Sequence, residues 1–287
     1  VTLKPDYAEA YYNLGITFRE LGQLEAALKS YEKALAIKHE YPEAHNNLGS
    51  VLLDLGSLDS ATDHFEWALA FKPNYPEAHN NLGVVARKLE KLDKAIKSFN
   101  KAIDIQPNYV QAHSNLGNIL QDIGQLDAAM DCYKNALAIN PNHTQCYLDI
   151  GLIHKEKGQI DDAIKFFEKA LTINPNHAVT YDNLSDIKKY TIDQKHITKM
   201  QSLLSSDSLS PSDRRHLCFA LAKVNENLDN QDELFKYLHE ANSLRKEELN
   251  YSLDRSKTLF LNVKEIFGAP YLDIEKSLSS EPSTFKP

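Results

Sequence analysis

The chain has 287 residues, a formal net charge of −8 and 42% apolar residues. This acidic balance argues against nucleic-acid binding, because no basic stripe is available to displace counterions from phosphate. The three cysteines show neither CxxC nor His/Cys ligand spacing, so we expect a reducing, cytoplasmic location and no disulfide framework. The sequence contains no signal peptide and no apolar run long enough to span a bilayer, so no membrane association is expected.

A segment of 34 residues recurs through the first part of the chain. Five glycines stand 34 residues apart: Gly15, Gly49, Gly83, Gly117 and Gly151. Each glycine is followed at fixed distances by an alanine, an aromatic residue and a second alanine; in the third copy these are Ala95, Phe99 and Ala102. Self-similarity at a fixed period is typical of a repeat architecture.

Each copy predicts two helices joined by a short turn. Apolar and small residues have helical spacing in both halves, as in EAHNNLGVVARKL and LDKAIKSFNKAIDI. The small residues would let the two helix backbones approach closely, and the aromatic residue would fill the space beside them. The turn usually contains a second glycine, but the third copy has Glu90 there, so we expect that turn to avoid the left-handed conformation.

This pattern resembles the tetratricopeptide repeat (TPR). The resemblance implies an all-α fold, a right-handed TPR superhelix or α-solenoid with a C-terminal helical cap formed by a degenerate repeat. Five full repeats would occupy 8–41, 42–75, 76–109, 110–143 and 144–177, after the tail of a preceding repeat at 1–7. The aromatic position near the start of each repeat is occupied by His45, His79 and His113 in the middle three, which we interpret as packing residues.

Beyond residue 177 the repeat signal decays. Residues 178–210 would form a sixth, degenerate repeat and a linker helix, with Ser185 at the glycine position. Ser210-Pro211 is typical of a helix start, since serine can cap and proline fits the first helical position. Residues 211–268 are predicted to form a helical cap or degenerate repeat plus a final helix over 250–267, and 269–287 a linker or tail.

The C-terminal region also resembles bacterial proteins that join TPR repeats to a sulfotransferase domain. The resemblance covers roughly 207–287 and is carried by Leu209–Arg215, Phe219–Lys223, Glu240–Asn242, Arg245, Tyr251 and Thr284–Pro287. It implies that this chain is the non-catalytic portion of a larger transferase, whose adjoining catalytic domain would use the phosphosulfate donor PAPS.

The chain itself offers no catalytic machinery. Nine of the 10 glycines occupy repeat positions and Gly268 ends a predicted helix, so none remains for a phosphate-cradling loop. Neither GxGxxG nor GxxxxGK[ST] occurs. We therefore predict no catalytic residue, no cofactor in this chain and no metal site.

One recurring position points to binding. The residues two before each glycine position are Asn13, Asn47, Asn81, Asn115, Asp149 and Asn183. In the TPR fold these side chains would form a row along the concave groove, where a carboxamide can pair with a peptide unit without reading its side chain. The row resembles the asparagine ladder of O-GlcNAc transferase. The alternative is that these asparagines are solvated or bonded to the adjacent repeat.

Basic residues should flank this row. Arg19, Arg87 and Lys155 are expected to project into the groove further along the same helices. The sequence thus favours a binding module that holds a polypeptide or protein partner, as the substrate-recruiting part of a sulfotransferase. Two alternatives remain open: a purely structural or homo-oligomerising array, and the TPR region of another transferase such as an O-GlcNAc-transferase-like glycosyltransferase.

Overall fold

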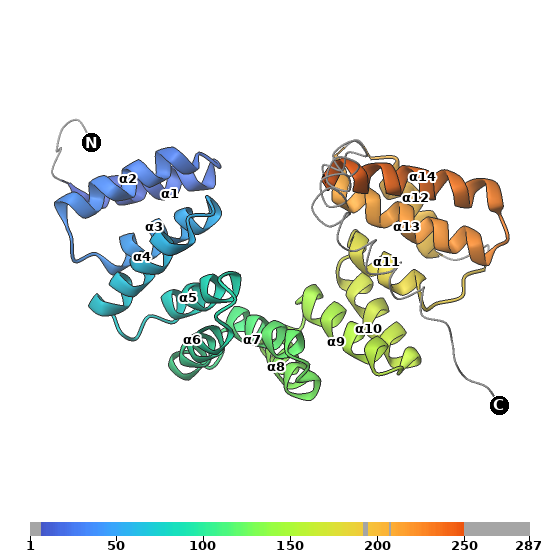
Figure 1. Ribbon diagram of the computed structural model, residues 1–287, viewed down its shortest axis with the longest axis horizontal. Helices are drawn as coiled ribbons and strands as arrows, with labels where there is room; N and C mark the ends of the chain where they lie inside the picture. The colour runs from blue at the N-terminus through green and yellow to red at the C-terminus, as the bar shows by residue number, and fades with distance from the viewer. Residues whose placement is uncertain (1–6, 192–194, 207, 250–287) are drawn as a thin grey trace, which may run out of the picture. The chain divides into compact units, whose positions relative to one another are not determined.

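The computed structural model describes residues 7–191, 195–206 and 208–249. Within these residues all regular secondary structure is helical, fourteen α-helices in all (Figure 1). The chain divides into two compact bodies, an N-terminal body up to Pro175 and a C-terminal body from Asn176. The prediction of an all-α fold is confirmed.

The N-terminal body consists of five helical hairpins, which we number repeats 1 to 5. The first helix of each hairpin, the A helix, has 13 residues, and the second, the B helix, has 14. The hairpins are α1 Ala8–Glu20 and α2 Leu24–Ile37; α3 Pro42–Asp54 and α4 Leu58–Phe71; α5 Pro76–Lys88 and α6 Leu92–Ile105; α7 Val110–Asp122 and α8 Leu126–Ile139; α9 Thr144–Glu156 and α10 Ile160–Ile173. Within this body the B helices α2, α4, α6 and α8 also pack on the next A helix, so the core runs from one repeat to the next.

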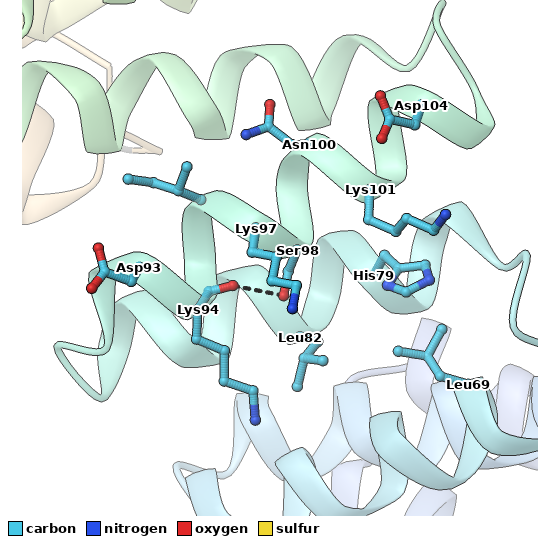
Figure 2. A pocket seen from close by; sticks show the side chains of 11 residues that line it. Leu69, His79, Leu82, Asp93, Lys94, Lys97, Ser98, Asn100, Lys101 and Asp104 are labelled. Carbon is cyan, nitrogen blue, oxygen red and sulfur yellow. Dashed lines mark hydrogen bonds between the residues drawn. The ribbon is translucent and has the colours of Figure 1, made fainter.

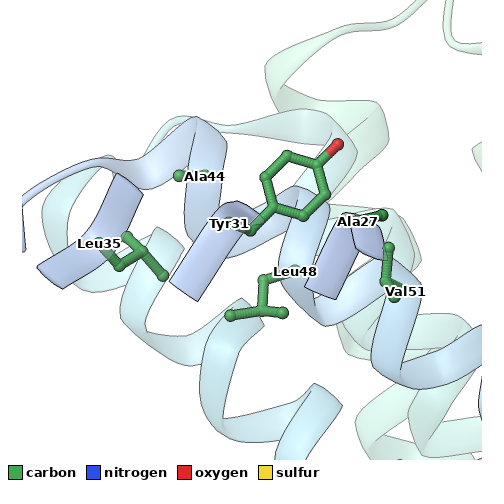
Figure 3. Close-up of a cluster of buried hydrophobic side chains, with 6 residues drawn as sticks. All are labelled: Ala27, Tyr31, Leu35, Ala44, Leu48 and Val51. Atoms are coloured by element: carbon green, nitrogen blue, oxygen red, sulfur yellow. The ribbon is translucent and has the colours of Figure 1, made fainter. Parts of the chain in front are cut away.

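The repeating glycines allow each hairpin to close around an aromatic ring. A Cβ atom added to Gly83 would lie 2.6 Å from the ring of Phe99, which is fully buried. The same contact recurs between the glycine and the aromatic residue of all five repeats. Figure 3 shows the next layer of the core, where Tyr31 of α2 lies among Ala44, Leu48 and Val51 of α3. Each of these glycines therefore makes room for the aromatic ring of its own repeat.

The turn between A and B helices uses one left-handed residue. Glycines occupy this position in four repeats with φ of 72° to 79°, and nothing lies within 4 Å of an added Cβ. Glu90 occupies it in repeat 3 and has φ 58°, so our expectation that this turn avoids the left-handed region is wrong. The packing of the two helices against each other requires a left-handed residue in this turn, and it outweighs the preference of a residue with a Cβ for negative φ.

The histidines near the start of three A helices tie each A helix to the segment before it. His79 Nε2 lies 2.9 Å from the carbonyl oxygen of Pro73, and His113 Nε2 lies 2.9 Å from that of Pro107. His45 makes the corresponding contact, at 3.0 Å, to the carbonyl oxygen of His39. An Nε2–H donor satisfies a carbonyl that follows the end of a B helix, which gives these residues a structural role.

The described part of the C-terminal body contains four helices: α11 Ala178–Ser185, α12 Lys195–Leu204, α13 Pro211–Asn227 and α14 Gln231–Glu248. α11 has 8 residues, against 13 in the A helices of repeats 1 to 5, in line with the decay of the motif at Ser185. α13 begins as predicted, because Ser210 Oγ accepts a hydrogen bond of 3.0 Å from the Asp213 amide. The predicted helix at 250–267, the tail at 269–287 and residues 1–6 lie outside the described residues.

Candidate peptide-binding surface

The A helices of the N-terminal body share one surface. Successive A helices contact one another directly, from α1 and α3 to α7 and α9, while the B helices of repeats 1 to 4 each pack between two A helices. Helices that approach each other most closely lie on the inside of a curved stack. The surface formed by α1, α3, α5, α7 and α9, the inner face, is therefore where the predicted asparagine row belongs.

The asparagines of this row are bonded from repeat to repeat. Asn81 Nδ2 donates a hydrogen bond of 3.0 Å to Asn46 Oδ1, and Asn115 Nδ2 donates one of 2.9 Å to Asn80 Oδ1. Asn47 Nδ2 donates correspondingly to the Tyr12 hydroxyl, at 3.1 Å. The row therefore joins neighbouring A helices, as in the alternative considered for it.

These contacts leave part of each carboxamide available. Asn47, Asn81 and Asn115 are half-buried, and Asn13 in the first repeat is exposed. Asn81 Oδ1 accepts only a long contact of 3.4 Å from Asn80 Nδ2, and a carbonyl oxygen has two lone pairs. A ligand on the inner face can therefore meet an acceptor at these positions. Asn183 belongs to the C-terminal body, where its Nδ2 donates to the carbonyl oxygen of Val179.

Asp149 is the exception in the row. Its Oδ1 accepts a hydrogen bond of 2.8 Å from Gln145, but its Oδ2 is buried without a partner, and the residue is only 7% exposed. Burial raises the pKa of Asp149 to about 6, although the Gln145 bond and the charge of Arg87 oppose that rise. A carboxylate cannot donate to the preceding A helix as the asparagines do, so the repeat-to-repeat bond is missing here.

The predicted flanking arginines are held in ion pairs along the inner face. Arg19 lies 3.3 Å from Asp54, which joins α1 to α3, and Arg87 lies 2.7 Å from Asp122, which joins α5 to α7. Both pairs are exposed, so a ligand carboxylate could compete for either guanidinium. Lys155 is partly exposed near the end of α9.

An aromatic and charged edge at the starts of the A helices was missed at the sequence level. Tyr41 and Tyr75 precede α3 and α5, with Lys38 Nζ 4.4 Å and Lys72 Nζ 4.3 Å from their ring centroids. Lys72 also pairs with Glu43 at 2.9 Å. The signal was present in the sequence, because tyrosines recur every 34 residues at Tyr7, Tyr41, Tyr75 and Tyr109.

A hollow lies outside the inner face, against the B helix of repeat 3. It has a volume of about 980 Å³ and is lined mainly by α6, with contributions from α4 and α5 (Figure 2). Leu69, Leu82 and Ile96 supply apolar lining, and the His79 ring borders it. Lys94, Lys97 and Lys101 lie along it on α6, with Asp93 and Asp104 beyond them. We call this the outer hollow.

The described residues hold no group of three or more His, Cys, Asp or Glu side chains that could bind a metal ion. Burial raises the pKa of Cys146 to about 11 and that of Cys218 to about 12, so both thiols are protonated at neutral pH. None of the described helices is both long and apolar enough to cross a membrane.

Stacked helical hairpins with a polar inner face define a class, the α-helical solenoids that act as protein-interaction scaffolds. Family models described as "TPR repeat" match residues 17–56 and 49–87, and a model described as "Tetratricopeptide repeat" matches 76–109, 110–143 and 144–177. Together they span more than half of the chain. The chain therefore belongs to the TPR proteins.

Solved structures show the same fold. MamA is 27% identical over 57% of this chain and 96% of its own, with a TM-score of 0.52. TTC0263, a TPR protein of Thermus thermophilus, is 23% identical over 63% and 98%, with a TM-score of 0.54. The Cut9–Hcn1 hetero-tetramer of the APC/C is 23% identical over 65% and 37%, with a TM-score of 0.59.

A search of curated proteins gives no significant match. The matches to the family models end at residue 177 and do not reach 207–287, which carries the sulfotransferase resemblance. That resemblance therefore gains no support from the comparisons.

Proposed function

We propose that the inner face of the N-terminal body holds an extended polypeptide through its backbone, at the row formed by Asn13, Asn47, Asn81 and Asn115. The observation that carries this proposal is that the nitrogen and the oxygen of these carboxamides have different partners. The Nδ2 of Asn47, Asn81 and Asn115 is committed to the preceding A helix, while the Oδ1 keeps acceptor capacity on a half-exposed side chain. The amide is thus oriented by the fold before a peptide arrives.

The spacing of the row suits an extended chain. Neighbouring A helices lie about 8–10 Å apart, and an extended strand advances roughly 3.3 Å per residue. Each row position would therefore meet every third residue of the ligand, accepting a hydrogen bond from its backbone N–H. With a net gain of about 0.5–1.5 kcal/mol per bond, binding would be weak and tolerant of sequence.

A scan of N-methylated peptides tests this geometry. The best binder from a peptide array is labelled, and each backbone N–H in turn is replaced by N-methyl before titration by fluorescence anisotropy. We expect affinity to fall at every third position and to change little between. Loss of affinity without a three-residue period, or none at any position, would contradict backbone recognition by this row.

Asn13→Ala is the matched protein variant, because Asn13 is exposed and makes no side-chain hydrogen bond among the described residues. It should weaken the peptide at one position and leave the melting temperature unchanged. Asn81→Ala should affect both affinity and stability, since its Nδ2 also bonds Asn46.

We also propose that the scaffold recruits substrate for a sulfotransferase domain in a larger protein. Only the resemblance of residues 207–287 supports this second step. Co-expression of the chain with a PAPS-dependent catalytic domain encoded in the same reading frame, if one follows, would test it by measuring sulfate transfer to the bound peptide.

A further inference from the structure

The outer hollow is lined by three lysines and, at its two ends, by two aspartates, Asp93 and Asp104. Within the described residues, Lys94 pairs with Glu66 at 2.8 Å, while neither Lys97 nor Lys101 has a carboxylate at ion-pair distance. Lys97 and Lys101 are four residues apart on α6, so their side chains project on one side of that helix, about 5–6 Å apart at Cβ. Asp93 and Asp104 lie beyond this stretch of α6, so the positive charge that could pair with a ligand carboxylate is local to Lys97 and Lys101.

The preceding repeat shows what fills the corresponding space. Thirty-four residues before His79 and Lys101 stand His45 and Trp67. The Trp67 ring stacks on the His45 ring, with centroids 6.3 Å apart and planes at 25°, and Phe71 stacks on the other two. Repeat 2 therefore covers its histidine with aromatic rings supplied by its own B helix.

Repeat 3 has no such cover. The position of Trp67 is taken by Lys101, that of Phe71 by Ile105 and that of His64 by Ser98. These smaller or flexible side chains leave the His79 ring at the border of the hollow, with Leu69 and Leu82 (Figure 2). His79 itself is held in place by its bond to the Pro73 carbonyl. The chain thus repeats the histidine and omits the aromatic residue that would cover it.

We propose that the outer hollow docks an acidic segment of a partner protein, whose aromatic side chain lies over His79 and whose carboxylates pair with Lys97 and Lys101. The aromatic residue would take the place that Trp67 occupies in repeat 2. Two flanking carboxylates would match the two lysines, and the apolar lining from Leu69, Leu82 and Ile96 would exclude water around the ring. This site is separate from the inner face, so it does not depend on the function proposed above.

The first test is a titration with a defined probe. The probe is a fluorescein-labelled pentapeptide with a central tryptophan and two glutamates on each side, measured by fluorescence polarisation on the full chain. Lys97→Glu with Lys101→Glu should weaken binding at least tenfold. Lys29→Glu with Lys33→Glu changes the same two helix positions in repeat 1, outside the hollow, and should weaken it less than twofold.

The second test fills the hollow with the aromatic residues that repeat 2 has at the same positions. Lys101→Trp combined with Ile105→Phe copies two aromatic residues of repeat 2 into repeat 3 and should abolish probe binding. The thermal melt, followed by circular dichroism, should be unchanged or higher, so that a loss of binding cannot be assigned to unfolding. Lys101→Gln, which removes the charge and leaves the hollow open, should show an intermediate loss.

Three results would overturn the proposal. Equal weakening by the repeat 1 and repeat 3 charge reversals would show that only the overall charge matters. Unchanged affinity in Lys101→Trp/Ile105→Phe would show that the probe binds elsewhere, and equal binding of a probe with alanine in place of tryptophan would remove the aromatic anchor. Asn13→Ala should bind the probe as the wild type does, which separates this site from the inner face.

Discussion

The contact between Gly83 and Phe99 leaves no space for a side chain at position 83. A helix-interior Gly→Ala change ordinarily stabilises by about 0.5–1 kcal/mol, but here the new methyl group would lie 2.6 Å from a fully buried ring. Overpacking of this kind costs typically about 1–3 kcal/mol, so the steric term should win. Gly83→Ala should lower the urea midpoint. Adding Phe99→Leu should restore part of the loss; two strictly additive losses would contradict the contact.

Glu90 gives a prediction of opposite sign. Its φ of 58° places a residue with a Cβ in the left-handed region, which costs roughly 1–2 kcal/mol. Glu90→Gly should therefore raise the free energy of unfolding, by about 0.5–1 kcal/mol once the added chain entropy is counted. Lys91→Gly is the matched control, because Lys91 has φ −87° and gains nothing. The comparison is made by chemical denaturation, and a stabilised control would refute the backbone explanation.

Asp149 should make stability depend on pH. Its pKa in the folded state is raised to about 6 from 3.8, so the folded state holds the proton more tightly than the unfolded chain. The stabilising effect of protonation is fully present below pH 4 and is lost as the pH rises through 6. A shift of this size corresponds to about 3 kcal/mol at most.

Asp149→Asn should therefore be more stable than the wild type at pH 8, by on the order of 2 kcal/mol, with a difference that shrinks toward pH 4. Urea denaturation at pH 4, 6 and 8 measures this. The reciprocal variant Asn115→Asp should acquire a similar pH dependence, because it places an acid at the same repeat position and removes the bond to Asn80. A difference independent of pH would rule out titration of Asp149 as its cause.

At the scale of elements, the asparagine row acts between helices. Asn81→Ala removes the donor to Asn46 Oδ1, which is then unpaired between α3 and α5; Ser50 Oγ loses a long contact but keeps its bond to the Asn46 carbonyl oxygen. We expect a loss of about 1–3 kcal/mol. Asn13→Ala, at the same position of repeat 1, should lose less than about 0.5 kcal/mol, as exposed substitutions do. Equal losses in the two melts would show that the repeat-to-repeat bonds do not stabilise the stack.

The hairpins could be predicted from sequence because their signals are periodic. Glycine, alanine and an aromatic residue at fixed offsets define each helix pair, and the helix bounds follow from them. The partners of the inner-face residues could not be predicted, since they depend on the distance between neighbouring A helices. Asn81 meets Asn46, and Arg87 meets Asp122, each 35 residues apart, and only the packing of successive repeats brings such pairs together. The outer hollow could not be predicted either, since it depends on how much of the space beside His79 the Lys101 side chain fills.

For the molecule as a whole, stacking implies that distant repeats are energetically independent. Gly15 and Gly151 lie in repeats 1 and 5 of the N-terminal body and contact different rings, Tyr31 and Phe167. The losses caused by Gly15→Ala and Gly151→Ala should add within about 0.5 kcal/mol. The adjacent pair Gly83→Ala and Gly117→Ala should deviate from additivity, because Phe99 packs against Leu116 and Ile119 of the next repeat. Equal behaviour of both pairs in denaturant titrations would contradict nearest-neighbour coupling.

Trp67 is the chain's single tryptophan, it is 48% exposed, and its ring stacks on His45 and Phe71. Its intrinsic emission therefore reports on the second hairpin alone, whereas ellipticity averages over every helix. In a stack that frays from its ends, the red shift of this single indole should lag behind the loss of ellipticity on heating. The wild-type protein thus contains a built-in fluorescence probe for the unfolding of repeat 2.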